Sequence, residues 1–194
     1  MVEPTSIKIV AVGDVLVGKT ALYVAYKTGV YSTALPPTVF ENYKVTAALD
    51  GIKYDLSLWD TAGHESYDRL RALSYSSTDV FLVLFSLVDR QTFGNVTNKW
   101  IPEVRHYVPD AKILLVGMQC DLKTDPEVVA KLCKKKLKPV SYGEGLQLSK
   151  EIEAAGYIEC SAKTMEGIHD VFTEAIRIFQ TPEKPKEKKQ CKIF

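Results

Sequence analysis

Short apolar segments alternate with longer amphipathic segments along most of the chain. The apolar segments are too short for helices and are typical of strands buried on both faces of a parallel sheet; they are residues 80–84, 112–117 and 157–160. The segments near residues 92–105, 142–155 and 167–179 have apolar positions at helical spacing. This alternation predicts an α/β fold with helices on both faces of the sheet. We expect its core to include Trp59, Phe81, Leu82 and Leu84.

The N-terminal third adds a strand, a loop, a helix and a hairpin. Residues 7–12 form a strand that leads through a glycine-bounded loop into a helix at residues 21–27. Residues 43–49 and 52–59 flank Asp50-Gly51, a dipeptide favoured in two-residue hairpin turns. We therefore expect one antiparallel pair in a mixed, mostly parallel sheet of six strands, within a three-layer fold.

The length favours one domain and a short tail. A chain of 194 residues is close to the usual size of a single domain. We predict a domain at residues 5–180 and a flexible, basic tail at residues 181–194, where apolar residues nearly vanish. Asp125 before Pro126 has the order of an N-cap and a first helical residue, so an additional helix is expected over residues 125–137.

Composition and charge narrow the possible functions. The four cysteines lack the paired spacing of a zinc site or a redox motif. The net charge is +1, which gives no overall field to attract nucleic acid. Residues 183–194, however, contain five lysines and two glutamates, so this segment carries +3 and residues 1–182 carry −2. The basic excess therefore lies entirely at the C-terminal end.

Residues 13–20 carry the clearest chemical motif. They read Gly-Asp-Val-Leu-Val-Gly-Lys-Thr and fit the pattern G-x-x-x-x-G-K-[ST] between a strand and a helix, which defines a phosphate-binding P-loop. Lys19 would bind β- and γ-phosphate oxygens, and the Thr20 hydroxyl would ligate Mg²⁺. Asp60, at the end of the following strand, would hold the water shell of the same ion. The pattern predicts a nucleoside triphosphate site without identifying the base or the reaction.

Several segments, taken in order, resemble the Rho family of Ras-like small GTPases. They are GDVLVGKT (13–20), PPTVFENY (36–43), WDTAGHE (59–65), YDRLRALSY (67–75) and CSAKT (160–164). The additional helix at residues 125–137 is similar to the insert helix that separates Rho proteins from other Ras-like proteins. The resemblance implies a P-loop NTPase fold with this insert, and a GTP/GDP switch that uses Mg²⁺.

The resemblance also implies roles for individual residues. Thr38 is expected to ligate Mg²⁺ and sense the γ-phosphate, Tyr31 to pack against the base, and Asp121 to accept hydrogen bonds from guanine. The implied nucleotide-binding set is Val15, Leu16, Val17, Gly18, Lys19, Thr20, Ala21, Tyr31, Thr38, Gly63, Gln119, Asp121, Leu122, Ser161, Ala162 and Lys163. The implied metal ligands are Thr20, Thr38 and, through water, Asp60, and the implied catalytic residues are Lys19, Thr38, Gly63 and His64. The implied effector and regulator surface contains Val39, Phe40, Glu41, Tyr67, Leu70 and Leu73.

Two departures from the family pattern predict impaired GTP hydrolysis. Val15 stands where most members have glycine, and its methyl groups would crowd the approach of water and of a partner's arginine to the γ-phosphate. His64 stands where a glutamine usually orients the attacking water. Two other interpretations of His64 remain open: a general base, and an exposed residue without a chemical role.

Two further departures predict fast nucleotide exchange. The base-binding pattern is Asn or Thr, Lys, any residue, Asp, and this chain has Met118-Gln119-Cys120-Asp121. Met118 lacks the hydrogen-bonding groups of asparagine, and Gln119 has a shorter stem than lysine for covering the base. Losing one or two such contacts would weaken binding roughly tenfold to a hundredfold. Leu35, where a tyrosine is usual, either weakens the clasp on the phosphates or is an ordinary surface residue.

The last four residues, Cys191-Lys192-Ile193-Phe194, resemble a C-a-a-X prenylation signal. Cys191 is the expected lipidation site, and the alternative is a chance cysteine. A prenyl group alone gives marginal membrane binding, which the neighbouring lysines would strengthen. We therefore expect a cytoplasmic protein at the cytoplasmic face of the plasma membrane or of endomembranes.

The resemblance implies a monomer whose partners are effectors, exchange factors, activating proteins and dissociation inhibitors, with signalling to the actin cytoskeleton. Two rival functions remain open: a scaffold that binds GTP or GDP without cycling, and a P-loop small-molecule kinase. The kinase would need an acceptor site and a lid, which no segment supplies. The scaffold shares every binding residue with the switch, so only turnover separates the two.

Overall fold

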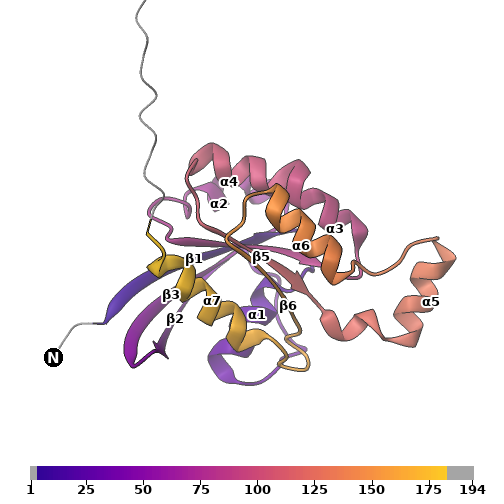
Figure 1. Ribbon diagram of the computed structural model, residues 1–194, viewed down its shortest axis with the longest axis horizontal. Coiled ribbons are helices and arrows are strands. Elements are labelled where there is room, and N and C mark those ends of the chain that lie inside the picture. The colour runs from indigo at the N-terminus through magenta and orange to yellow at the C-terminus, as the bar shows by residue number, and fades with distance from the viewer. Residues whose placement is uncertain (1–3, 183–194) are drawn as a thin grey trace, which may run out of the picture.

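A computed structural model describes residues 4–182 and shows a three-layer α/β domain (Figure 1). The central sheet has six strands in the order β2-β3-β1-β4-β5-β6. All neighbouring pairs are parallel except β2 and β3. The strands are β1 (Thr5–Gly13), β2 (Phe40–Leu49), β3 (Ile52–Thr61), β4 (Val80–Ser86), β5 (Ile113–Met118) and β6 (Gly156–Cys160). The predicted α/β class, sheet and antiparallel pair are confirmed.

The helices cover both faces of this sheet. The long ones are α1 (Lys19–Thr28), α5 (Pro126–Lys134), α6 (Tyr142–Glu151) and α7 (Ile168–Gln180). The shorter ones are η1 (Glu65–Tyr67), α2 (Asp68–Ala72), α3 (Arg90–Asn95), η2 (Val96–Trp100), α4 (Ile101–Tyr107) and η3 (Cys120–Lys123). Helices α1 and α7 pack on one face, and α3, α4 and α6 pack on the other, while α5 projects from one end (Figure 1).

Alternation along β1 divides the core into two clusters. Ile7, Ile9 and Ala11 face α1 and α7, whereas Val10 and Val12 face the helices on the opposite side. Every residue of β4 is buried, as expected for a central parallel strand. Trp59, which the sequence predicts in the core, packs against the second of these clusters but is only half-buried. Its ring also contacts the Lys8 ammonium, 3.9 Å from its centre.

The β2–β3 hairpin turns at the predicted dipeptide. Asp50 and Gly51 both have positive φ, 52° and 76°. This is the backbone of a type I′ turn, whose twist matches that of the flanking strands. Leu49 consequently pairs with Ile52, which fixes the register of both strands.

The helix predicted at residues 92–105 is not regular. Residues 90–107 are helical throughout, but η2 is a π-helical turn in which the Ile101 amide donates to the Val96 carbonyl. The next residue, Pro102, has no amide hydrogen, and its ring clashes with the carbonyl four residues earlier in a regular helix. The wider turn before this proline relieves that conflict.

Two other helices end earlier than predicted. The insert helix α5 begins at Pro126 with Asp125 as its N-cap and stops at Lys134, before Lys136 adopts φ 56°. Helix α6 stops at Glu151, before Glu153 adopts φ 54°. A left-handed residue ends a helix because its backbone cannot continue the hydrogen-bond ladder. No helix within residues 4–182 is long and apolar enough to cross a membrane.

Candidate functional site

The P-loop connects β1 to α1 at the carboxyl edge of the parallel strands. Gly13 has φ 151°, and a Cβ there would lie 2.4 Å from the Leu84 carbonyl oxygen. Gly18 caps α1 with φ 105°. A side chain is therefore excluded at Gly13 and strained at Gly18, which explains the spacing of the two glycines. The first amides of α1 point into the loop and can bind an anion.

Lys19 is buried beneath this loop. Its ammonium donates to the carbonyl oxygens of Gly13 and Asp14, both at 2.8 Å. Burial lowers the pKa of Lys19 to about 8, although Asp60 and Asp14 act in the opposite direction. A buried ammonium held by two neutral carbonyls is suited to an incoming phosphate, whose charge favours the protonated form.

Three oxygen-bearing side chains converge beside Lys19 and fit a magnesium ion. The hydroxyls of Thr20 and Thr38 lie 2.6 Å apart. Asp60 is fully buried, and neither carboxylate oxygen has a hydrogen-bond partner within residues 4–182. Burial raises the pKa of Asp60, while nearby Thr20, Lys19 and Thr38 oppose this shift. A buried carboxylate without partners next to two hydroxyls matches the hard oxygen ligands that Mg²⁺ prefers.

The predicted base-binding residues lie at the ends of β5 and β6. Gln119 has φ 65°, and its side chain spans two elements: Nε2 donates to the Leu16 carbonyl at 3.4 Å, and Oε1 accepts from Ser86 Oγ at 2.5 Å. Gln119 therefore ties this loop to the P-loop. Ser86 could not be predicted from the sequence, because a serine at the end of an apolar strand has no distinctive pattern.

Met118 is almost completely buried beneath the same loop. The Cys160 thiol lies 3.4 Å from its sulfur, and a Cβ at Gly18 would lie 3.2 Å from its methyl carbon. Met118 therefore fills space by packing, where asparagine would form hydrogen bonds. In the neighbouring Cys120, burial and nearby acidic groups raise the pKa of the thiol to about 11, so it remains protonated.

Other residues predicted to contact the base lie in η3 and in the loop after β6. Asp121 and Leu122 are half-buried in η3. Ser161 is buried, and its hydroxyl accepts from the Thr164 amide at 3.2 Å, which orders the loop after β6. Ala162 is buried and Lys163 is exposed.

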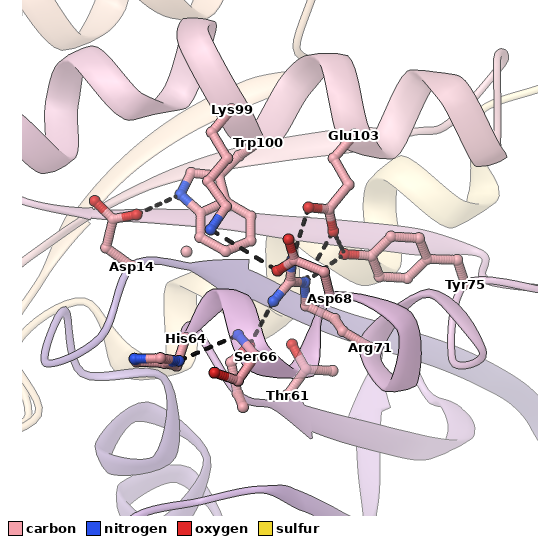
Figure 2. A network of polar contacts seen from close by, with 12 residues as sticks. Asp14, Thr61, His64, Ser66, Asp68, Arg71, Tyr75, Lys99, Trp100 and Glu103 are labelled. Carbon is pink, nitrogen blue, oxygen red and sulfur yellow. Dashed lines mark hydrogen bonds and ion pairs between the residues drawn. The ribbon is translucent and has the colours of Figure 1, made fainter.

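Gly63 rests directly on the P-loop. A Cβ there would lie 2.5 Å from the Gly13 carbonyl oxygen and 2.6 Å from the Val15 amide nitrogen. The adjacent His64 is exposed, and its Nδ1 accepts a hydrogen bond from the Ser66 amide at 3.2 Å, which caps η1. The ring points away from the buried network shown in Figure 2. Val15 is half-exposed on the P-loop.

The predicted effector surface is apolar and largely exposed. Val39, Phe40, Leu70 and Leu73 are exposed large hydrophobic residues, as are Tyr31 and Leu16. Glu41 is exposed and Tyr67 half-buried. Val17 is buried, and Ala21 is partly buried against the core. Contiguous patches of exposed apolar side chains are typical of protein-binding surfaces.

One buried cation, Arg71, has no distinctive sequence pattern. Arg71 has no side-chain exposure and pairs with Asp68 and Glu103. Burial lowers its pKa, but the hydrogen bonds that Arg71 donates to Glu103 and Asp68, together with the charge effects of Tyr75 and Glu103, outweigh burial and raise the pKa above its usual range. Figure 2 shows these groups between α2 and α4. Cys191, the predicted lipidation site, lies outside the described residues.

These features define a P-loop nucleotide-binding protein: a loop bounded by two glycines, a buried lysine and a candidate divalent-cation site, all at the carboxyl edge of a parallel sheet. Within residues 4–182, no group of three or more His, Cys, Asp and Glu side chains could hold a metal ion, whereas the candidate magnesium site consists of two hydroxyls and Asp60. A protein-family model described as the Ras family matches residues 8–181. The chain therefore belongs to the Ras family of small GTPases, whose members switch between GTP-bound and GDP-bound states.

Proposed function

We propose that this chain is a Rho-type small GTPase that binds GTP or GDP with Mg²⁺ and signals through its exposed apolar surface. The observation that carries the proposal is the convergence of Thr20, Thr38 and Asp60 beside Lys19, with no hydrogen-bond partner for the Asp60 carboxylate within residues 4–182. Asp121, half-buried at the far end of the site, favours guanine, because its carboxylate can accept both of guanine's edge donors. The insert helix α5 supports the Rho assignment by resemblance.

The residues divide the work of binding and hydrolysis among themselves. Lys19 and the P-loop amides bind the phosphates, and Gly63 and Thr38 contact the γ-phosphate. Bound Mg²⁺ neutralises charge on the phosphate oxygens. Loss of the γ-phosphate releases Thr38 and Gly63, which alters the apolar surface that includes Val39 and Phe40.

Hydrolysis is slow in this proposal. Val15 places two methyl groups where the attacking water and an activating arginine must approach. His64 uses Nδ1 to cap η1, so its orientation serves the local backbone. With Nδ1 engaged, the imidazole has only Nε2 to offer the attacking water, whereas a glutamine amide offers a donor and an acceptor together, and Val15 offers neither.

Nucleotide release is fast in this proposal. Met118 contributes packing and accepts only a weak hydrogen bond from the Cys160 thiol, and Gln119 directs both ends of its amide to protein groups. The base therefore has fewer polar contacts than in family members that have asparagine and lysine at these positions. Cellular GTP then reloads the protein without help.

The proposal extends to the membrane. Prenylation at Cys191, together with the basic tail, would attach the protein to the cytoplasmic face of the plasma membrane or of endomembranes, where effectors for the actin cytoskeleton would bind. Five lysines on and after α5 (Lys131, Lys134, Lys135, Lys136 and Lys138) are exposed and form either a solvated face or a contact with lipid or an effector.

The test combines three readings on the purified protein. The co-purifying nucleotide is identified, and its release and single-turnover hydrolysis are timed with and without Mg²⁺. The proposal expects a guanine nucleotide, release within minutes, and hydrolysis slower than release. Release over hours and hydrolysis at a rate typical of small GTPases would contradict the atypical behaviour. Binding without any turnover would favour the non-cycling scaffold.

A further inference from the structure

A chain of contacts connects the P-loop to α2 through the π-helical turn (Figure 2). The Asp14 carboxylate accepts from Asn95 Nδ2 at 2.7 Å and from Trp100 Nε1 at 2.9 Å. Asn95 is the last residue of α3, and Trp100 is the last residue of η2. The irregular turn therefore presents donors from both of its ends to one P-loop carboxylate.

The Trp100 ring also contacts the buried Arg71. The guanidinium carbon of Arg71 lies 4.7 Å from the centre of the ring, a distance at which a cation is attracted to an aromatic face. Trp100 itself is fully buried. Figure 2 shows the indole between Asp14 and the group of charges around Arg71.

Arg71 in turn holds the segment that carries Gly63. Its Nη1 donates to the Ala62 carbonyl at 2.9 Å. Its other nitrogens are fixed by Glu103, at 2.7 and 2.8 Å, and by Asp68 at 2.6 Å. Because Arg71 is anchored on α4 by Glu103, the Ala62 carbonyl has a fixed position relative to η2 and α4.

The contacts close into a ring. Gly63 follows Ala62 and rests against the backbone of Asp14, where an added Cβ would lie 2.5 Å from the Asp14 carbonyl carbon. Asp14 binds Trp100, Trp100 packs on Arg71, and Arg71 binds Ala62. Two sets of contacts therefore determine the separation between the P-loop and Gly63. One is their direct contact, and the other is the chain of contacts through Trp100.

We propose that Trp100 is a positioning residue for γ-phosphate recognition, acting through Asp14 on one side and Arg71 on the other. The inference rests on the proposed function, in which Gly63 contacts the γ-phosphate of GTP and has no equivalent contact with GDP. If Trp100 sets the separation between Gly63 and the P-loop, its loss weakens GTP binding selectively. A merely structural role would affect both nucleotides equally.

The chain offers a matched pair of variants, because it has only two tryptophans. Trp100→Phe removes the hydrogen bond to Asp14, and Trp59→Phe removes an equivalent bond from Trp59 Nε1 to Ser57 Oγ, 2.9 Å long, on the sheet face. Dissociation constants for GDP and for a non-hydrolysable GTP analogue are measured with Mg²⁺. Trp100→Phe should weaken analogue binding about tenfold relative to GDP, the effect of losing a hydrogen bond to a charged group. Trp59→Phe should leave the ratio of the two dissociation constants unchanged.

Fluorescence gives a second reading that does not depend on the folding of Trp100→Phe. In the Trp59→Phe protein the remaining tryptophan is Trp100, and its emission should differ between the GDP and analogue complexes. An equal loss of affinity for both nucleotides, or identical Trp100 emission in both complexes, would overturn the inference. If the unsubstituted protein binds neither nucleotide, the proposed function fails instead.

Discussion

Some side chains at the nucleotide site can be predicted from a local motif, and others depend on partners far away in the sequence. Lys19 and Thr20 follow from a local spacing of glycines, so the sequence predicts both their presence and their neighbours. Arg71 and Ser86 depend on partners 32 and 33 residues away in sequence. Long-range polar pairs leave no periodic signal, so the sequence could not reveal either of them. The roles of Thr38 and Asp121 were predicted from the family resemblance and not from the spacing of residues.

Restoring the usual residues at positions 15 and 64 should restore hydrolysis. In the double variant Val15→Gly/His64→Gln, water reaches the γ-phosphate and an amide orients it, so single-turnover hydrolysis with Mg²⁺ should accelerate at least about tenfold. The two single variants serve as controls and apportion the gain. An unchanged rate in the double variant would show that neither residue limits the reaction.

Met118→Asn should slow the release of GDP. Asparagine offers hydrogen bonds to the P-loop where methionine only packs, and one or two such bonds predict release slower by about tenfold. Release of a fluorescent GDP analogue after excess GDP is added measures the rate. Met118→Leu, which preserves the apolar packing, should release nucleotide as fast as the unsubstituted protein. If both variants behave alike, hydrogen bonding at position 118 does not control exchange.

Helices and strands follow from pattern wherever one face is apolar. Both hairpin strands and the insert helix could be predicted, because Asp50-Gly51 and Asp125-Pro126 are strong local signals. The π-helical turn before Pro102 could not, because periodicity does not distinguish a widened turn from a regular one. This unpredicted turn supplies the donors that bind Asp14.

The start of α6 predicts a pH-dependent contribution to stability. Glu144 accepts from the Ser141 amide and hydroxyl at 2.8 and 2.7 Å and pairs with Arg90. The Arg90 guanidinium and these Ser141 donors lower the pKa of Glu144 from 4.5 to about 2. The folded state thus prefers the ionised form, and its stabilisation is complete above pH 4.5 and lost as the pH falls towards 2.

Glu144→Gln should therefore lower the melting temperature at pH 7 and have less effect in acid. Because the side chain is partly exposed, we expect the substitution to lower the free energy of unfolding by about 1 kcal/mol at pH 7. Thermal unfolding between pH 7 and 2.5 measures the difference, which should shrink below pH 4.5. Glu151→Gln, on the same helix but bonded to the neutral Gln147, is the control and should show little change at any pH. A difference independent of pH would contradict the account.

At the scale of the whole molecule, charge divides along the chain. Residues 1–182 carry −2 and contain the nucleotide site, whereas residues 183–194 carry +3 and contain Cys191. A net charge of +1 conceals this division. In the proposed function, the protein combines a nucleotide switch with a separate membrane anchor.

Cys191→Ser should move the protein from membranes to the cytosol. A basic segment without a lipid chain binds anionic membranes only weakly. Fractionation of cells that express a tagged protein measures the distribution. Cys133→Ser, at an exposed cysteine on α5, is the matched control and should leave it unchanged. Equal membrane fractions for both variants would contradict prenylation at Cys191.

The most direct test of the central claim is a competition between guanine and adenine nucleotides for the purified protein. Bound fluorescent GDP is titrated with GTP, GDP, ATP and ADP in the presence of Mg²⁺. GTP and GDP should displace the bound nucleotide, and adenine nucleotides should bind at least about a hundredfold more weakly, because pairing Asp121 with adenine would leave buried groups unpaired. Displacement by ATP at the same concentration as GTP, or no binding of GDP at all, would contradict a guanine-nucleotide switch.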